Sequence, residues 1–369
     1  MDYVRLAELK LKSEAEEAAS AHASAESTTD IPLKDMTIPS MITDDYVWGD
    51  ILENIASADA RLVNLETSVT THNAPCPKGI NYRMHPKNVD TLKAAGIQCC
   101  ILANNHVLDY GIQGLNETLR TLHSVHIRTV GAGRNSREAQ APAVIATGKE
   151  HYLLVFALGS ESSGVPDTWE ATEIRPGIAL HRLGDDANSI ALRIAKEVKE
   201  FQSKHGGRSK PTVVVSIHWG GNWGYEIARW QRELAHALVD VGGCDIVHGH
   251  SSHHPIGLEL YKERLILYGC GDLINDYEGI SGQGHERYHP DLALLYLPTL
   301  NKTTGNLMSL ELRPVKIRGF RLSHVDVNAK ERKWLAETLN REIKRFSTFP
   351  SAFRPQVVVS GKTLELKKK

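Results

Sequence analysis

The chain carries, at residues 97–106, the stretch Ile97-Gln-Cys-Cys-Ile-Leu-Ala-Asn-Asn-His106. Its first half is apolar and has the length of a strand, whereas its end carries two amides and an imidazole. This order is typical of a buried strand whose carboxyl end presents polar side chains, here Asn105 and His106. Because strand ends hold side chains rigidly, we expect a functional site there.

Three other segments share this arrangement. Glu66 follows the run Arg61–Val63, His218 ends the run Thr212–Ile217, and His250 and His253 follow a short apolar stretch at 245–247. One histidine after a strand is more often a hydrogen-bonded structural residue, but four such strand ends together favour a shared site. We therefore predict a metal centre formed by five residues: Glu66, Asn105, His218, His250 and His253. Imidazole, amide and carboxylate donors suit one or two divalent ions such as Mn, Fe or Zn.

His106 directly follows the predicted ligand Asn105, so we expect it at the rim of the site. There it could protonate a leaving group as a general acid. His248 lies inside its apolar run rather than past the end, and we predict a structural role for it.

Four further residues are candidates for substrate binding: Asn81, Arg83, Asn222 and Asp272. An arginine fork suits a carboxylate or phosphate, with a surface salt bridge as the alternative. Asn222 lies in a glycine-rich loop that allows close approach to a ligand, or serves only as a connection. Asp272 either lines the pocket or forms a turn.

Strand-like runs alternate with amphipathic helical stretches from Tyr46 onward, which predicts an α/β or α+β fold. Runs at 292–297, 307–313 and 315–321 predict consecutive strands, and 329–346 predicts a helix capped by Asn328. Residues 13–30 predict a solvated helix or disordered insert, and Lys362–Lys369 a solvated tail. We expect three segments: a charged, low-complexity segment at 1–45, the main domain at 46–325, and a C-terminal helix with a basic tail at 326–369.

Composition excludes several classes of protein. The 369 residues carry a formal net charge of −1, which gives no reason to expect nucleic acid as a partner. No apolar run reaches the roughly 20 residues that span a bilayer. Five cysteines without a paired motif favour a reducing compartment, and no signal peptide is evident, so we expect a cytoplasmic protein.

Six motifs together resemble the CapA-type, poly-γ-glutamate synthesis family of the calcineurin-like metallophosphoesterases. They lie at residues 46–50, 64–67, 80–86, 102–111, 217–220 and 249–255, and the resemblance covers about 46–297. It implies a two-sheet sandwich flanked by helices, with a metal site at one edge and an anionic small molecule or polymer as substrate. Carried over by motif, Glu66 is the bridging carboxylate, Asn105 the amide ligand and His106 the general acid. His218, His250 and His253 take the imidazole positions.

One departure from the family pattern concerns the first strand. Related chains open with a strand that ends in Gly-Asp and supplies a metal ligand, and no such segment precedes residue 46 here. We expect this strand to be missing through a truncated gene model, an alternative start or real loss, with reduced or no phosphoesterase activity.

Two functions follow from these patterns. The first is a CapA-like metal-dependent hydrolase linked to poly-γ-glutamate biosynthesis. The alternative is a binding module of the same fold that lacks a competent metal pair.

Overall fold

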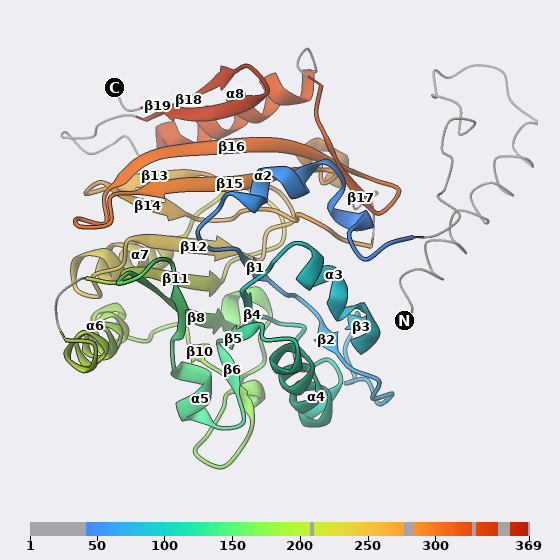
Figure 1. The fold of residues 1–369 in the computed structure, drawn as a ribbon, viewed down its shortest axis with the longest axis vertical. Coiled ribbons are helices and arrows are strands. Elements are labelled where there is room, and N and C mark those ends of the chain that lie inside the picture. The colour runs from blue at the N-terminus through green and yellow to red at the C-terminus, as the bar shows by residue number, and fades with distance from the viewer. Residues whose placement is uncertain (1–41, 207–209, 277–283, 327–329, 346–354, 368–369) are drawn as a thin grey trace, which may run out of the picture.

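The computed structural model describes residues 42–206, 210–276, 284–326, 330–345 and 355–367 (Figure 1). These residues form a mixed α/β fold with several sheets, which confirms the predicted fold class. The predictions for residues 13–30, for the first strand and for the cap at Asn328 lie outside the described residues. Within the described part, no helix combines the length and apolar character needed to cross a bilayer.

The largest sheet has seven strands and contains most of the parallel pairing. Its order is β10-β8-β11-β12-β14-β13, and β7 pairs with β8. All neighbours from β10 to β14 run parallel, whereas β7 and β13 run antiparallel to their partners. The strands are β7 (Ala143–Ala146), β8 (Tyr152–Ser160), β10 (Leu180–His181), β11 (Thr212–His218), β12 (Ile246–His250), β13 (Leu258–Tyr261) and β14 (Arg264–Leu267).

A second, three-stranded sheet is entirely parallel, with the order β1-β4-β5. Its strands are β1 (Leu62–Asn64), β4 (Cys99–Ile101) and β5 (Arg128–Val130). Alternate side chains of β4 enter different cores, as a period of two requires. Cys99 and Ile101 share a buried cluster with Val214 of the large sheet, whereas Cys100 shares one with Leu115 on the other side. The two sheets therefore pack face to face.

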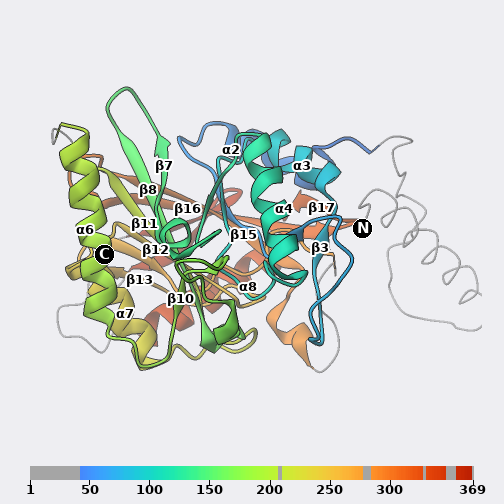
Figure 2. The same ribbon diagram turned by 90° about the horizontal axis from the view of Figure 1, so that it is seen from below.

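Helices cover the outer faces of both sheets (Figure 2). The helices α6 (Ala187–Lys204) and α7 (Arg229–Asp240) lie over the large sheet, where Ile194 and Leu238 share a core with Val213 and Val215. The helices α3 (Val89–Ala94) and α4 (Gly111–Ser124) lie over the small sheet. This arrangement is the predicted two-sheet sandwich flanked by helices.

A third sheet lies at one end of the molecule, at the top of Figure 1. Its order is β15-β16-β19-β18, and β17 pairs with β16. The helix α8 (Lys330–Arg345) packs on it, because Leu335 and Leu339 share a core with Leu312 and Leu364. The strands are β15 (Leu292–Leu300), β16 (Leu307–Arg318), β17 (Arg321–His324), β18 (Gln356–Ser360) and β19 (Thr363–Lys367).

Two predictions for this sheet are wrong. The runs 307–313 and 315–321 were predicted as separate strands, yet β16 continues through Pro314. Pro314 falls between the residues that pair with β19 and those that pair with β17, so no partner on that side needs the missing N–H. The predicted solvated tail is instead strand β19 over most of its described part, with Leu364 and Leu366 buried. The division into three segments stays a prediction.

Short elements connect the layers. They are η2 (Tyr46–Ile51), α2 (Leu52–Ala56), β2 (Ser68–Val69), β3 (Arg83–Met84), η3 (Pro86–Asn88), β6 (Ala132–Gly133), α5 (Ser136–Gln140), η4 (Glu161–Ser163), η5 (Asp167–Trp169), β9 (Gly177–Ile178) and η6 (His285–Tyr288). The strands β2 and β3 pair with each other, as do β6 and β9. Two-residue strands carry no periodicity, so the sequence pattern does not predict them.

Candidate metal centre

The four predicted strand ends meet at one edge of the sandwich. In the large sheet, His218 at the end of β11 lies opposite His250 at the end of β12. In the small sheet, β1 and β4 run parallel, and the chain continues from them to Glu66 and Asn105. Because parallel strands end on the same side, both sheets deliver their polar side chains to the same place.

His218 is fully buried and contacts three of the other predicted ligands. Its Nε2 lies 3.1 Å from Oδ1 of Asn105 and 3.8 Å from Oε1 of Glu66. Its Nδ1 lies 2.8 Å from Nδ1 of His250. The structure thus brings together Glu66, Asn105, His218 and His250, from four distant parts of the sequence.

Both ring nitrogens of His250 are engaged by protein groups. While Nδ1 faces His218, Nε2 lies 2.9 Å from Oγ of Ser216. The same hydroxyl lies 2.9 Å from Nδ1 of His248. This contact fits the structural role predicted for His248, and it leaves neither nitrogen of His250 facing an open position.

Burial keeps these imidazoles neutral. Burial lowers the pKa of His218 to about 3, and the positive charges of His106, His253 and Lys78 act in the same direction. Burial also lowers the pKa of His250 well below its ordinary value. The neutral imidazole is the form that binds a metal ion.

Glu66 is held by neighbouring amides. Its Oε2 accepts a hydrogen bond from Nδ2 of Asn64 at 3.0 Å, and Asn104 donates to the Oδ1 of Asn64 at 3.1 Å. Burial, followed by the charge of Asp272, raises the pKa of Glu66 to about 8. A cation beside this group would favour its charged form, because opposite charge lowers the pKa of a carboxyl.

The fifth predicted ligand, His253, is bound to Asp272. Its Nδ1 lies 3.0 and 3.1 Å from the two carboxylate oxygens, and its backbone N–H donates to the carbonyl of Asn222 at 3.0 Å. Burial lowers the pKa of His253, but the hydrogen bond and charge of Asp272, with the charge of Glu66, outweigh it and raise the pKa overall. Of the predicted substrate-binding residues, Asp272 and Asn222 therefore lie beside a predicted ligand.

The other two predicted substrate-binding residues bind their own loop. Arg83 donates from Nη1 to the carbonyl of His72 and to Oδ1 of Asn73, both at 3.1 Å. Asn81 donates to the carbonyl of Cys76 at 3.1 Å. The structure gives neither residue a contact with the predicted ligands among the residues it describes.

The predicted general acid His106 is positioned by its neighbours. Its Nδ1 lies 2.7 Å from Oδ2 of Asp109, and its ring stacks on Tyr82 with 3.8 Å between the ring centres. Burial lowers the pKa of His106, although Asp109 acts to raise it. In the described part of the chain, Nε2 makes no hydrogen bond, so it remains available to a substrate.

Two residues of this site were missed by the sequence prediction, Asp109 and Lys78. Asp109 is fully buried and accepts hydrogen bonds from Nζ of Lys78 at 2.7 Å and from the backbone N–H of Tyr82 at 2.6 Å. Lys78 also donates to the carbonyl of Asn105. The motif that includes Asp109 carried a signal, whereas Lys78 reaches its partner across 31 residues and shows no local pattern.

The donors that gather at His218 Nε2 are of the kinds that divalent ions bind. In the described residues, no group of three or more His, Cys, Asp or Glu side chains lies close enough to hold a metal. His218 and Glu66 supply two such side chains, and the amide oxygen of Asn105 supplies a third donor. This mixed set suits Mn, Fe or Zn.

Comparison with known proteins places the chain in a family. Residues 12–277 match the family described as bacterial capsule synthesis protein PGA_cap, so the match begins before the motif at Tyr46. A Mycobacterium tuberculosis protein named probable polyglutamine synthesis accessory protein is 40% identical over 316 residues, which cover 84% of this chain and 79% of that protein.

Two Bacillus proteins are more distant relatives. The PGA biosynthesis protein CapA of Bacillus subtilis is 29% identical over 74% of this chain and 63% of its own length. The capsule biosynthesis protein CapA of Bacillus anthracis is 27% identical over 63% of this chain and 54% of its own length. These matches confirm the resemblance drawn from the six motifs: the chain belongs to the CapA-like family of bacterial capsule synthesis proteins.

Proposed function

We propose that this chain is a metal-dependent hydrolase of the metallophosphoesterase type that acts in the biosynthesis of a glutamate polymer. The names of its relatives support the polymer, since they refer to polyglutamine synthesis, capsule biosynthesis and PGA biosynthesis. The observation that carries the proposal is the convergence of Asn105 and Glu66 on the Nε2 of buried His218.

The protein would hold one divalent ion, Mn, Fe or Zn, through His218, Asn105 and Glu66. When bound, such an ion supplies a Lewis acid and lowers the pKa of a coordinated water. His218 arrives neutral, so the ring has no charge to lose, and with its one proton on Nδ1, beside His250, its Nε2 can act as a ligand. Among the described residues, His250 supports His218 through their Nδ1 contact, and His253 orients Asp272 at the rim.

His106 would transfer a proton to the leaving group. Asp109 holds Nδ1, which fixes the ring and directs Nε2 outward, and its negative charge favours the protonated ring that can act as the acid. Stacking on Tyr82 restricts ring rotation further. Lys78 places a positive charge at the same rim, which favours an anionic substrate such as a phosphoester or a γ-linked glutamate polymer.

A second candidate is a non-catalytic module that binds the polymer in the same place. Its support is specific: both nitrogens of His250 and the Nδ1 of His253 are engaged by protein groups. With these contacts, fewer predicted ligands among the described residues are left for an ion, whereas a two-metal site needs several.

Replacement of His218 by Ala distinguishes the two candidates. The hydrolase predicts that wild-type protein binds Mn²⁺ in calorimetry and cleaves bis(p-nitrophenyl) phosphate or a γ-glutamyl anilide. His218→Ala should lose both properties, and a chelator should abolish wild-type turnover until Mn²⁺ is restored. His123→Ala, which removes an exposed imidazole bonded to Thr129, is the matched control and should retain both.

The binding module predicts a different pattern. Wild-type protein would then bind poly-γ-glutamate without turnover, and His218→Ala would bind it equally well. A wild-type protein that neither binds Mn²⁺ nor cleaves either substrate sinks the hydrolase proposal.

A further inference from the structure

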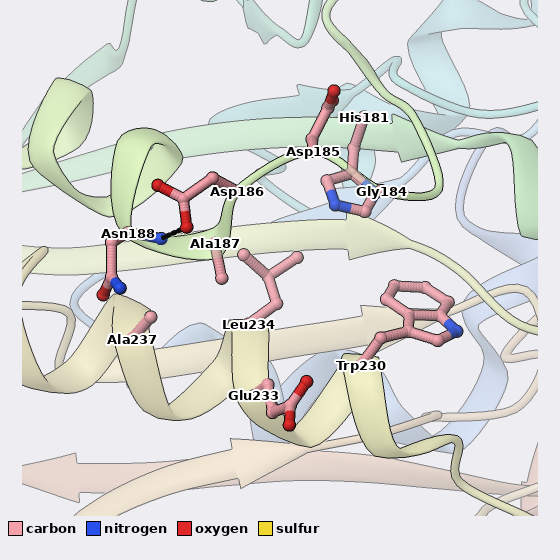
Figure 3. Close-up of a pocket in the computed structure, with 10 residues that line it drawn as sticks. All are labelled: His181, Gly184, Asp185, Asp186, Ala187, Asn188, Trp230, Glu233, Leu234 and Ala237. Atoms are coloured by element: carbon pink, nitrogen blue, oxygen red, sulfur yellow. Dashed lines mark hydrogen bonds between the residues drawn. The ribbon is translucent and has the colours of Figure 1, made fainter.

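A cavity of about 450 Å³ lies between the start of α6 and α7 (Figure 3). The carboxylates of Asp185 and Glu233 point to opposite sides of this space, so they do not converge on one ligand. Hydrogen bonds converge instead on the ammonium of Lys78, which contacts the backbone of the predicted ligand Asn105. Lys78 is therefore the stronger candidate for a further role.

The peptide group between Asn105 and His106 joins the predicted amide ligand to the predicted general acid. Its carbonyl oxygen, which belongs to Asn105, accepts a hydrogen bond from Nζ of Lys78 at 2.5 Å. Its N–H, which belongs to His106, donates to Oδ1 of the fully buried Asn104 at 3.1 Å. Rotation of this planar group would redirect both neighbouring side chains. Lys78 and Asn104 therefore hold it from opposite ends.

Lys78 reaches the predicted acid by a second route, through Asp109. Its Nζ donates to Oδ1 of Asp109 at 2.7 Å, while Oδ2 accepts from Nδ1 of His106, also at 2.7 Å. A carboxylate only accepts, so Nδ1 carries a proton and cannot accept from Nζ of Lys78, which lies 3.4 Å away. One ammonium thus contacts both the backbone of the ligand and the carboxylate that orients the acid.

Most of the bonding capacity of Lys78 serves the protein itself. An ammonium has three N–H donors, and two of them bind Asn105 and Asp109. Nζ also lies 5.3 Å from the centre of the Trp169 ring, within the range of a cation–π contact. The charge can still attract an anion from a distance, but the hydrogen bonds are directed at protein groups.

We propose that Lys78 is a positioning residue: it pins the peptide group between Asn105 and His106 and the carboxylate of Asp109, which fixes the orientation of the ligand relative to the acid. Its effect on turnover rests on the proposed hydrolase. The pinning itself needs neither metal nor substrate, because its partners are protein groups.

Amide hydrogen exchange, followed by NMR, tests the pinning without any turnover. Lys78→Met keeps a long side chain but removes the charge and the donors. The N–H of His106 should then exchange roughly tenfold faster, because its segment opens more readily. The N–H of Val155, within β8, should exchange as in the wild type, which shows that the change is local. Unchanged exchange at His106 overturns the proposal.

Two further variants complete this test. Lys93→Met, which breaks an exposed pair with Asp90, is the matched control and should leave the exchange of His106 unchanged. Lys78→Gln keeps an N–H donor for one of the two partners, so exchange should rise by only about threefold. This variant decides the question if Lys78→Met does not fold, and wild-type exchange in it contradicts the pinning.

Turnover of bis(p-nitrophenyl) phosphate with Mn²⁺ separates positioning from substrate binding. In Lys78→Met, kcat should fall by roughly 10²-fold, while KM stays within about twofold, because the substrate contacts are unchanged. Lys78→Arg keeps the charge and donors and should recover at least about a tenth of the wild-type kcat. A raised KM with an unchanged kcat would assign Lys78 to substrate binding and overturn the proposal.

The hydrolase and the positioning role fail in different ways. A wild-type protein that neither binds Mn²⁺ nor turns over contradicts the hydrolase, whereas the exchange rates still decide whether Lys78 pins the peptide group. Faster exchange at His106 together with a wild-type kcat in Lys78→Met would show that the pinned orientation does not matter to the reaction, and it overturns the positioning role.

Discussion

At the residue scale, Asp109 is the most demanding position of the site. Its fully buried carboxylate faces three donors, from Lys78, His106 and the backbone of Tyr82. Asp109→Asn removes the charge and forces an amide N–H against one of these donors. We expect the free energy of unfolding to fall by about 2–4 kcal/mol, measured by urea denaturation.

A matched substitution controls for the change in chemistry. Asp90→Asn breaks the ion pair with Lys93, whose side chains are about half exposed. Such a pair contributes little, so the unfolding free energy should change by less than about 1 kcal/mol. If Asp109→Asn and Asp90→Asn lowered the unfolding free energy equally, the stabilising role of the buried Asp109 carboxylate would be contradicted.

The site residues differ in how far the sequence predicts them. Glu66, Asn105, His218 and His250 each follow an apolar strand, and parallel strands place their ends together, so their convergence was predictable. Lys78 lies in a loop without periodicity, and only the folded chain brings it to Asp109. The contact between His250 and Ser216 could likewise not be predicted from the sequence, because it depends on the register between strands β11 and β12.

At the element scale, the turn between β15 and β16 is packed against the start of β12. Gly305 has a φ of +77°, and a Cβ there would lie 1.9 Å from Oδ1 of Asp245. Asp245 in turn bonds Lys210 and Arg264, so it cannot move away without loss. Gly305→Ala should therefore lower the unfolding free energy by about 2–4 kcal/mol in thermal or urea unfolding.

Gly206 provides the control for this turn. It has the same φ of +77°, but no atom lies within 4 Å of an added Cβ. Gly206→Ala should therefore cost only the conformational strain, about 1–2 kcal/mol. If Gly305→Ala and Gly206→Ala lower the free energy of unfolding equally, the contact with Asp245 contributes nothing.

Elements with clear periodicity were predicted and those decided by distant partners were not. The helices α4, α6 and α7 are amphipathic stretches of the kind predicted from Tyr46 onward. β19 was missed because its lysine content suggested a tail, although Leu364 and Leu366 alternate with polar residues as a half-buried strand requires. Pro314 suggested a break in the strand, but β16 continues through it. On one side of β16 the partner strand changes at this residue, from β19 to β17.

At the scale of the whole molecule, the layers enclose all but one of the five cysteines. Cys99, Cys100, Cys244 and Cys270 are buried between the sheets and helices, and Cys76 is partly exposed. Burial raises the pKa of Cys99 to about 12 and that of Cys244 further, which suppresses the reactive thiolate. Thiol reactivity therefore reports whether the layers stay closed together.

We expect one thiol to react quickly with a chromogenic aromatic disulfide in native buffer at pH 8, and all five to react in concentrated urea. Cys76→Ser should abolish the fast reaction, whereas Cys270→Ser should preserve it. The four buried thiols should react at a rate set by global opening, which Gly305→Ala should increase and Gly206→Ala should increase less. A second fast thiol in native wild-type protein would show that one layer of the sandwich opens independently of the rest.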